Sequence, residues 1–253
     1  MVLLRVIVLV VVVGTLLALL RRPRRLARRA LLATLWMAVA LAMMSLGYLG
    51  SVAFIPVSLA ALIFYSYPLL VGAIAAAAGR ERLTPLKTAA LLVAFLGLAL
   101  ALGPRLEFLD WRGVACAVLA ALGMALAVSF GGKAMQGEDT LTMNFYTNLW
   151  LLIGLAAFMA VAGGFRLPAT GFGAIAALGV CVSYIVAFVT WFLALRMVSP
   201  VRLAALFNIE PLVSILAAFL LLGERLGPMQ LAGAALVLGS IVAMTLAGSR
   251  TKR

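Results

Sequence analysis

Residues 200–230 read PVRLAALFNIEPLVSILAAFLLLGERLGPMQ, an apolar run that carries Asn208, Glu210 and Pro211 near its middle. Such a run can cross a bilayer, because a hydrocarbon core of about 30 Å takes roughly 20 helical residues. At about 1.5 Å per residue, Glu210 lies about 14 Å into the helix, close to the midplane. A carboxylate at that depth costs roughly 2.5–3.5 kcal/mol, so we expect it to face a cavity or a partner rather than lipid. Pro211 lacks the N–H that would bond to the carbonyl of residue 207, which should loosen the helix beside the charge.

An earlier stretch of the chain repeats this one in the same order. PVSLAAL at 56–62 matches PVRLAAL at 200–206, and Pro68-Leu69 matches Pro211-Leu212. ERLTP at 81–85 then matches ERLGP at 224–228. Matches of leucine and alanine mean little in so apolar a chain, but the ordered proline and Glu-Arg-Leu series is specific. We interpret it as an internal duplication.

The composition indicates an all-α polytopic membrane protein. Hydrophobic residues make up 66% of the 253 positions, charged residues make up 11%, and the mean hydropathy is +1.24. Ordinary soluble chains are about half apolar and about a quarter charged. The net charge of +13 lies in short loops between apolar spans, so it is better explained by membrane topology than by nucleic-acid binding.

The sequence shows no pattern of a catalytic or metal site. It contains no histidine, and Cys116 and Cys181 lie inside apolar spans without the spacing of a metal site. We expect both cysteines to act as small apolar fillers. No phosphate-binding loop, nucleotide fingerprint or catalytic triad is present in the sequence, so we expect no cofactor, no metal and no enzymatic activity.

Nine apolar spans follow one another along the chain. The predicted spans are 2–20, 31–53, 57–78, 86–102, 113–130, 141–162, 172–195, 201–222 and 229–246. Arginines follow the first span rather than precede it, a stop-transfer pattern and not that of a cleaved signal peptide. Pro68 and Pro211 are the two prolines that fall inside predicted spans, and they are equivalent positions in the repeat.

The positive charges predict the orientation. If residues 21–30 are cytoplasmic and the spans alternate, five of the 20 Lys and Arg residues lie outside and the other fifteen lie inside. The five outer residues are Arg5, Arg105, Arg112, Arg166 and Arg225. The N-terminus is then outside and the C-terminus is cytoplasmic. Spans 57–78 and 201–222 enter from opposite sides, so the two copies of the repeat are inverted, as in secondary transporters whose site lies where interrupted helices meet.

On these residues the chain resembles the drug/metabolite transporter superfamily, specifically its EamA-type members. The resemblance is carried by SLAALIFYSYPLL at 58–70 and RLAALFNIEPLV at 202–213, each followed by Glu-Arg-Leu, and by Asp110-Trp111-Arg112-Gly113 before the fifth span. It covers nearly the whole chain. It implies a solute carrier of the bacterial inner membrane, with ten helices in two inverted repeats of five and both termini cytoplasmic.

The chain departs from that family pattern in its first half. Residues 1–110 form a first repeat with four spans, whereas 111–253 form a second repeat with five. Aligned by the repeat, the span 2–20 corresponds to the second helix of a unit. A start codon placed downstream of the true one, or a genuine nine-span variant, would explain the missing helix, and we favour the former.

Glu210 is the principal candidate for a binding residue. It could bind a cationic part of the substrate or carry a proton that couples transport. The structural alternative is a carboxyl that only hydrogen-bonds to a neighbour such as Asn208. Tyr65 and Tyr67 precede Pro68 in the matching helix and could line the cavity, although residues two apart point in different directions on a helix.

Other polar and aromatic side chains are weaker candidates. Tyr184 and Trp191 are seven residues apart in span 172–195 and share a face, which more often indicates packing or an interface than a substrate site. Asn144 and Asn148 are four apart, and we expect them to hydrogen-bond to another helix.

These features predict a secondary transporter that exports a small metabolite or drug-like solute across the inner membrane by alternating access. The outward direction is implied only by the family resemblance. A proton-coupled multidrug antiporter is the alternative, with protons as the coupling ion. A lipid-modifying enzyme is a more remote alternative, because the only intramembrane acid lies far from the headgroups. The expected partners are a small-molecule substrate, the lipid bilayer and a second copy of the chain as a homodimer.

Overall fold

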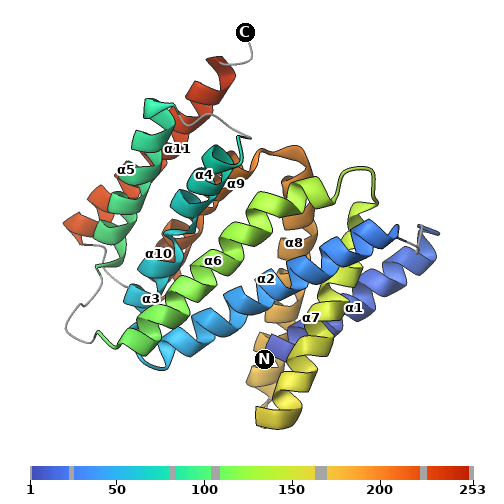
Figure 1. The fold of residues 1–253 in the computed structure, drawn as a ribbon. Coiled ribbons are helices and arrows are strands. Elements are labelled where there is room, and N and C mark those ends of the chain that lie inside the picture. The colour runs from blue at the N-terminus through green and yellow to red at the C-terminus, as the bar shows by residue number, and fades with distance from the viewer. Residues whose placement is uncertain are drawn as a thin grey trace. The chain divides into compact units, whose positions relative to one another are not determined.

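The computed structural model describes residues 2–22, 26–79, 84–103, 109–162, 170–222 and 227–250, and all regular structure in these ranges is helical. The elements are α1 (Val2–Leu19), α2 (Arg28–Val52), α3 (Val57–Phe64), α4 (Tyr67–Ala77), α5 (Pro85–Leu102), α6 (Trp111–Ala134), α7 (Thr140–Ala162), α8 (Gly171–Met197), α9 (Pro200–Phe207), α10 (Ile209–Leu222) and α11 (Pro228–Arg250) (Figure 1). Each of the nine predicted spans is present, two of them as pairs of shorter helices. The Glu-Arg-Leu motifs at 81–83 and 224–226 lie outside the described residues.

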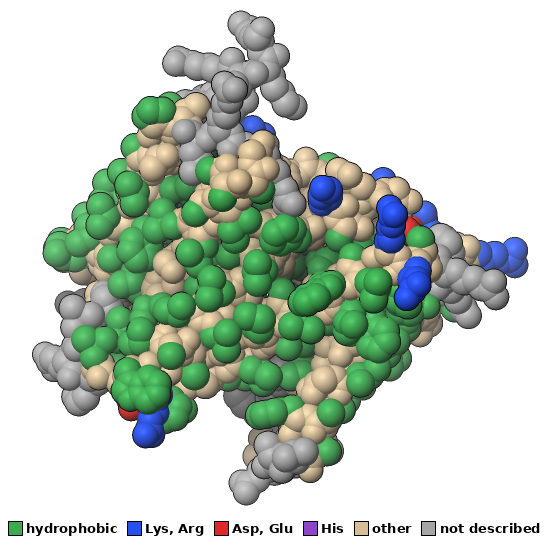
Figure 2. Space-filling model, in the orientation of Figure 1, with side chains coloured by type: hydrophobic (Ala, Val, Ile, Leu, Met, Phe, Trp, Pro, Cys, Tyr) green, Lys and Arg blue, Asp and Glu red, His purple; other side chains and the backbone are tan. Residues whose placement is uncertain are grey.

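Seven of these helical segments are long and apolar enough to cross a membrane, counting α3 with α4 and α9 with α10 as one segment each. The described parts of α1 and α11 form two shorter apolar helices, Leu3–Leu19 and Pro228–Met244. Large side chains are exposed on many of the helices, as at Trp36 and Leu221, which are 73% and 82% exposed. Hydrophobic side chains accordingly dominate the surface in Figure 2, with Lys and Arg in small groups near its margins. The prediction of a polytopic all-α membrane protein is confirmed.

Two helices are broken at equivalent points of the repeat, and proline chemistry explains where. A proline cannot donate to the carbonyl four residues before it. The carbonyls that lose their donor to Pro68 and Pro211 are those of Phe64 and Phe207, the last residues of α3 and α9. In both cases the chain turns within one or two residues and resumes as α4 or α10. The sequence duplication therefore has a structural counterpart.

Contacts divide the chain into two compact units, which are described separately. Unit 1 comprises Met1–Ala42 and Phe130–Val198, and unit 2 comprises Met43–Ser129 and Ser199–Arg253. The division falls within α2 and α6. The predicted repeats, 1–110 and 111–253, are a separate division based on sequence, and they remain a prediction.

In unit 1, α1 packs against both α7 and α8, which also contact each other. Leu9, Val13 and Leu17 of α1 are fully or almost fully buried, because one face of this helix is covered by aromatic and aliphatic side chains. Those side chains are Leu141, Phe145, Tyr184, Ile185, Phe188 and Val189.

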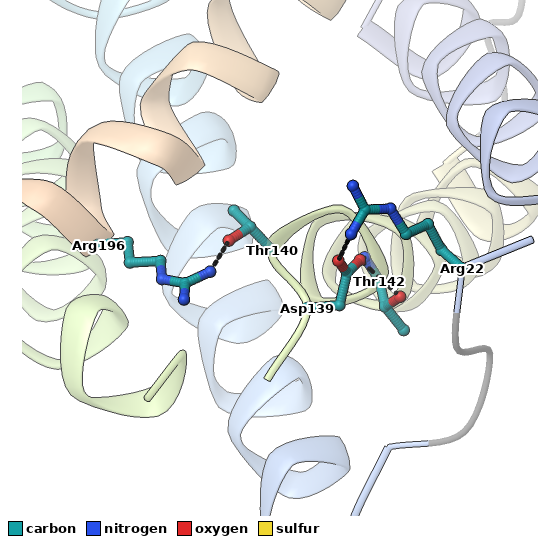
Figure 3. A network of polar contacts seen from close by, with 5 residues as sticks. All are labelled: Arg22, Asp139, Thr140, Thr142 and Arg196. Atoms are coloured by element: carbon teal, nitrogen blue, oxygen red, sulfur yellow. Dashed lines mark hydrogen bonds and ion pairs between the residues drawn. The ribbon is translucent and has the colours of Figure 1, made fainter. Parts of the chain in front are cut away.

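A polar network ties together one end of unit 1 (Figure 3). Asp139 caps α7 by accepting a hydrogen bond from the backbone N–H of Thr142 at 3.0 Å. Arg22, just after α1, pairs with the other carboxylate oxygen at 3.5 Å. Arg196, in the last turn of α8, donates to the hydroxyl of Thr140 at 3.3 Å. Three connecting regions that the charge pattern assigns to the cytoplasmic side thus meet at one end of this unit.

Replacing Asp139 with alanine should lower the free energy of unfolding by about 1–2 kcal/mol, because it removes the cap of α7. Arg22→Gln should cost less than about 0.5 kcal/mol, because the arginine side chain is 55% exposed and exposed ion pairs contribute little. Denaturant titration of the purified protein in detergent would compare the two. An equal cost for both variants would assign the stabilisation to the ion pair instead of the cap.

In unit 2, α5 and α11 are packed side by side (Figure 1). The broken helices surround this pair: α3 and α4 contact α5, whereas α9 and α10 contact α11. α4 also packs on α9. Since α5 follows the first broken helix and α11 follows the second, the contacts of one repeat are reproduced in the other.

Glycine allows the close approach of α5 and α11. A Cβ atom at Gly97 would lie 2.8 Å from the carbonyl oxygen of Gly233 and 2.8 Å from Cβ of Leu236. A Cβ at Gly233 would meet the backbone of Gly97 and Ala101. Residues further along α5 therefore contact residues earlier in α11, so the two helices are antiparallel. Inverted copies of a repeat require this relation.

Candidate functional site

Glu210 lies at the start of α10, directly after the helix break at Asn208. The break creates a helix N-terminus inside the predicted span, and free N–H groups at such a terminus favour a negative charge. The side chain is exposed in the structure, although the neighbouring Pro211 and Leu212 are buried. The acid therefore lies at a helix N-terminus and is not fully covered by the described residues.

Tyr65 is the direct partner of Glu210. The two side chains form a hydrogen bond, which joins the break after α3 to the break before α10. The ring of Tyr65 packs against the buried core between α5, α10 and α11, in contact with the cluster of Leu98, Leu212 and Val237. This packing fixes the ring, so the hydroxyl is held toward the carboxyl.

Aromatic rings extend from Tyr65 around the first break. The ring centroid of Phe64 is 5.1 Å from that of Tyr65, 5.5 Å from that of Tyr67 and 5.4 Å from that of Tyr48 on α2. Tyr48 and Tyr67 are both close enough to Glu210 to interact with it electrostatically. Three tyrosines therefore interact with Glu210, and Phe64 packs against each of them.

Two buried polar atoms at the breaks have no hydrogen-bond partner among the described residues: the hydroxyl of Tyr67 and Oδ1 of Asn208. Tyr67 is 1% exposed and Asn208 is 2% exposed, so neither group reaches bulk solvent. A buried polar group without a partner costs about 1–3 kcal/mol. Such groups accumulate where a ligand or water completes the hydrogen bonds.

Six of the predicted site residues are brought together here: Asn208, Glu210, Pro211, Tyr65, Tyr67 and Pro68. The expectation that Tyr65 and Tyr67 point apart assumed a continuous helix. Because α3 ends before Tyr65, the two ring centroids are 6.5 Å apart and both side chains interact with Glu210. A hydrogen bond from Asn208 to Glu210 is not found among the described residues, and Tyr65 takes that place.

Sequence reasoning did not select Tyr48 or Phe64 for this site. Tyr48 lies on α2, outside both broken helices, so the repeat does not mark it. Phe64 carries a usable signal, because it is the residue four before Pro68 and therefore ends its helix.

Tyr184 and Trp191 belong to unit 1, where they form one aromatic row with Phe188 on α8. Asn144 and Asn148 are also in unit 1. The prediction that they hydrogen-bond to another helix is wrong for the described residues. Nδ2 of Asn148 instead donates to Oδ1 of Asn144 on the same helix at 2.7 Å. Cys116 and Cys181 are free thiols, and no metal-binding cluster occurs among the described residues.

If the predicted export depends on this site, replacing Tyr65 with phenylalanine should lower it at least tenfold, because one hydrogen bond to a charged group is worth about 1.5–3 kcal/mol. The ring and its packing are retained in this variant. Tyr146→Phe, on α7 of unit 1, is the control for loss of a tyrosine hydroxyl. Export would be measured in cells with expression matched by immunoblot. Equal export by the two variants would remove Tyr65 from the site.

Two of the apolar helices are broken at equivalent points, with an acid at one break, which is an arrangement that secondary transporters share. The family model described as EamA-like transporter family matches residues 111–246, which is 136 of 253 residues, and the chain belongs to this family. This confirms the resemblance to EamA-type members of the drug/metabolite transporter superfamily.

One solved structure, titled "Crystal structure of protein", is similar over 96% of this chain and 87% of its own, with a TM-score of 0.80 and 20% identity. At that identity the likeness concerns the fold. No curated protein matches the chain.

Proposed function

We propose that this chain is a secondary transporter that exports a small metabolite or drug-like solute across the inner membrane by alternating access. The observation that carries the proposal is the carboxyl of Glu210 at a helix break, hydrogen-bonded to Tyr65 at the matching break. An acid in an apolar membrane helix is costly, and such residues usually mark a solute or ion pathway. Family membership supports the transport of a solute and leaves its identity open.

In this proposal Glu210 binds a cationic or hydrogen-bond-donating part of the substrate. Tyr48 and Phe64, which are half-buried, supply ring faces that contact an apolar body. Asn208 and the hydroxyl of Tyr67 would gain hydrogen bonds that they lack among the described residues. Binding that completes these bonds favours one arrangement of the broken helices over another, which is how a solute shifts a conformational equilibrium.

The proposed orientation places the C-terminus in the cytoplasm, and the two broken helices enter the membrane from opposite sides. The grouping of Arg22 and Arg196 at one end of unit 1 supports this assignment. Labelling of single cysteines with a membrane-impermeant maleimide in a cysteine-free background tests it. Accessibility of positions near Pro56 and Pro200 from the same side would overturn the inverted arrangement.

The first experiment is untargeted metabolite profiling of the medium from cells that express the chain and cells that do not. At least one small molecule should accumulate outside expressing cells in a manner that depends on Glu210. Counterflow of that molecule in proteoliposomes without a pH gradient would support simple exchange. A strict requirement for the gradient would favour the proton-coupled antiporter. No difference between the two media would contradict export.

A further inference from the structure

Arg5 in unit 1 is a charged group that the site around Glu210 does not use. It lies within the apolar helix Leu3–Leu19, and Cζ of its guanidinium is 4.6 Å from the centroid of the Tyr184 ring. Tyr184 is close to the middle of α8, so Arg5 lies well inside the bundle rather than at the outer end of its span, where the charge pattern places it. A cation at such a position usually has a partner and a function.

The described part of the protein gives Arg5 no anionic partner. Its Nε atom is buried without a hydrogen-bond acceptor. The ion pair found among the described residues joins Arg22 to Asp139 and does not involve Arg5. Stacking on Tyr184 uses the face of the guanidinium, whereas its N–H groups point outward in the plane and need oxygen acceptors.

A row of aromatic rings continues from Arg5 along α8. The ring of Phe188 is 4.3 Å from Tyr184 and 5.9 Å from Trp191, measured between centroids. Nε1 of Trp191 is buried and has no partner among the described residues. An indole N–H and a guanidinium can only donate hydrogen bonds, so both unpartnered groups along this row require an acceptor.

We propose that Arg5, Tyr184, Phe188 and Trp191 form a binding site for an organic anion with an aromatic or apolar body. The guanidinium fork binds the carboxylate in a bidentate manner. The body lies along the accessible parts of the aromatic row, and the Trp191 N–H donates to a further acceptor on the ligand. The claim that such an anion is also transported rests on the proposed function, whereas binding to this site does not.

Three probes of similar shape and different charge test the site: benzoate, benzyl alcohol and benzylammonium. Their dissociation constants would be measured from the thermal unfolding of the purified full-length protein in detergent. The variants are Arg5→Gln and Arg5→Lys, the second of which keeps the charge and removes the planar fork. Arg112→Gln is the matched control, because Arg112 also stacks on an aromatic ring, that of Trp111 at 5.9 Å, but is exposed.

Benzoate should stabilise the wild type more than either other probe does. Its dissociation constant should rise at least tenfold in Arg5→Gln and severalfold in Arg5→Lys, and it should stay unchanged in Arg112→Gln. Equal binding of benzoate to wild type and Arg5→Lys, or equal stabilisation by benzyl alcohol, would overturn the proposal. The lysine variant provides this test even where the glutamine variant does not fold.

Failure of this inference is distinguishable from failure of the proposed function. If benzoate binds without selectivity while export still depends on Glu210, the anion site is contradicted and the proposed transport function stands. Arg5-dependent binding of benzoate together with export that is unaffected by Glu210→Gln would support the anion site and remove the proposed transport site.

Discussion

Replacement of Glu210 by glutamine is expected to reduce export at least tenfold while the chain still inserts into the membrane at wild-type levels. Glutamine has nearly the same size, so α10 and its packing should be preserved. It removes the negative charge that the helix N-terminus favours and that a cationic substrate group or a proton would neutralise. Loss of one charge-assisted contact corresponds to about tenfold or more in affinity.

The measurement is export of the molecule identified by metabolite profiling, normalised to the amount of protein in the membrane fraction. Glu138→Gln is the matched control, because Glu138 lies in the turn before α7, outside the spans. Wild-type export by Glu210→Gln would reduce the carboxyl to a structural group. Export that persists but no longer responds to an imposed pH gradient would assign Glu210 to coupling rather than to solute binding.

The second large effect is expected at Gly233, where any side chain should force α5 and α11 apart. A Cβ atom at this position meets backbone atoms of Gly97 and Ala101, and backbone cannot move aside as a flexible side chain can. Gly233→Ala should therefore lower stability by about 1–3 kcal/mol, the range for overpacked interiors. Gly233→Val should cost more and should lower the yield of folded protein.

Gly239 provides the matched control on the same helix, because nothing lies within 4 Å of a Cβ atom built there. Gly239→Ala should be neutral or should stabilise by up to about 1 kcal/mol, since alanine favours a helix over glycine. Thermal unfolding in detergent, followed by size-exclusion chromatography, would compare the two alanine variants. Equal stabilities would mean that α5 and α11 do not approach as closely as the structure indicates.

The helical boundaries could be predicted from the sequence because proline and apolar run length determine them locally. Pro56 and Pro200 stand at the starts of α3 and α9, and Pro68 and Pro211 identify the helices that are broken. α3 and α9 end at Phe64 and Phe207, because the carbonyls of these residues would need the N–H that Pro68 and Pro211 lack. The location of Glu210 beside such a break was therefore accessible from the sequence.

The surroundings of Glu210 were less accessible, because they depend on contacts between segments that are far apart in the chain. The hydrogen bond to Tyr65 and the proximity of Tyr48 require α2, α3 and α10 to pack in one unit. Arg5 is a similar case. Its position near the start of the predicted span 2–20 suggests the outer end of a helix, but its environment is determined by how α1 packs on α8.

The two interrupted helices have a mechanical consequence. Each consists of two stiff segments joined by a linker of one or two residues, so a change in a few backbone dihedrals reorients one segment without unfolding either. α5 and α11 are continuous helices whose backbones pack closely at Gly97 and Gly233, so they cannot bend in this way. We therefore expect the short helices α3, α4, α9 and α10 to reorient while α5 and α11 stay fixed. Glu210 and Tyr65 lie at the two breaks, where a bound solute would influence this motion most.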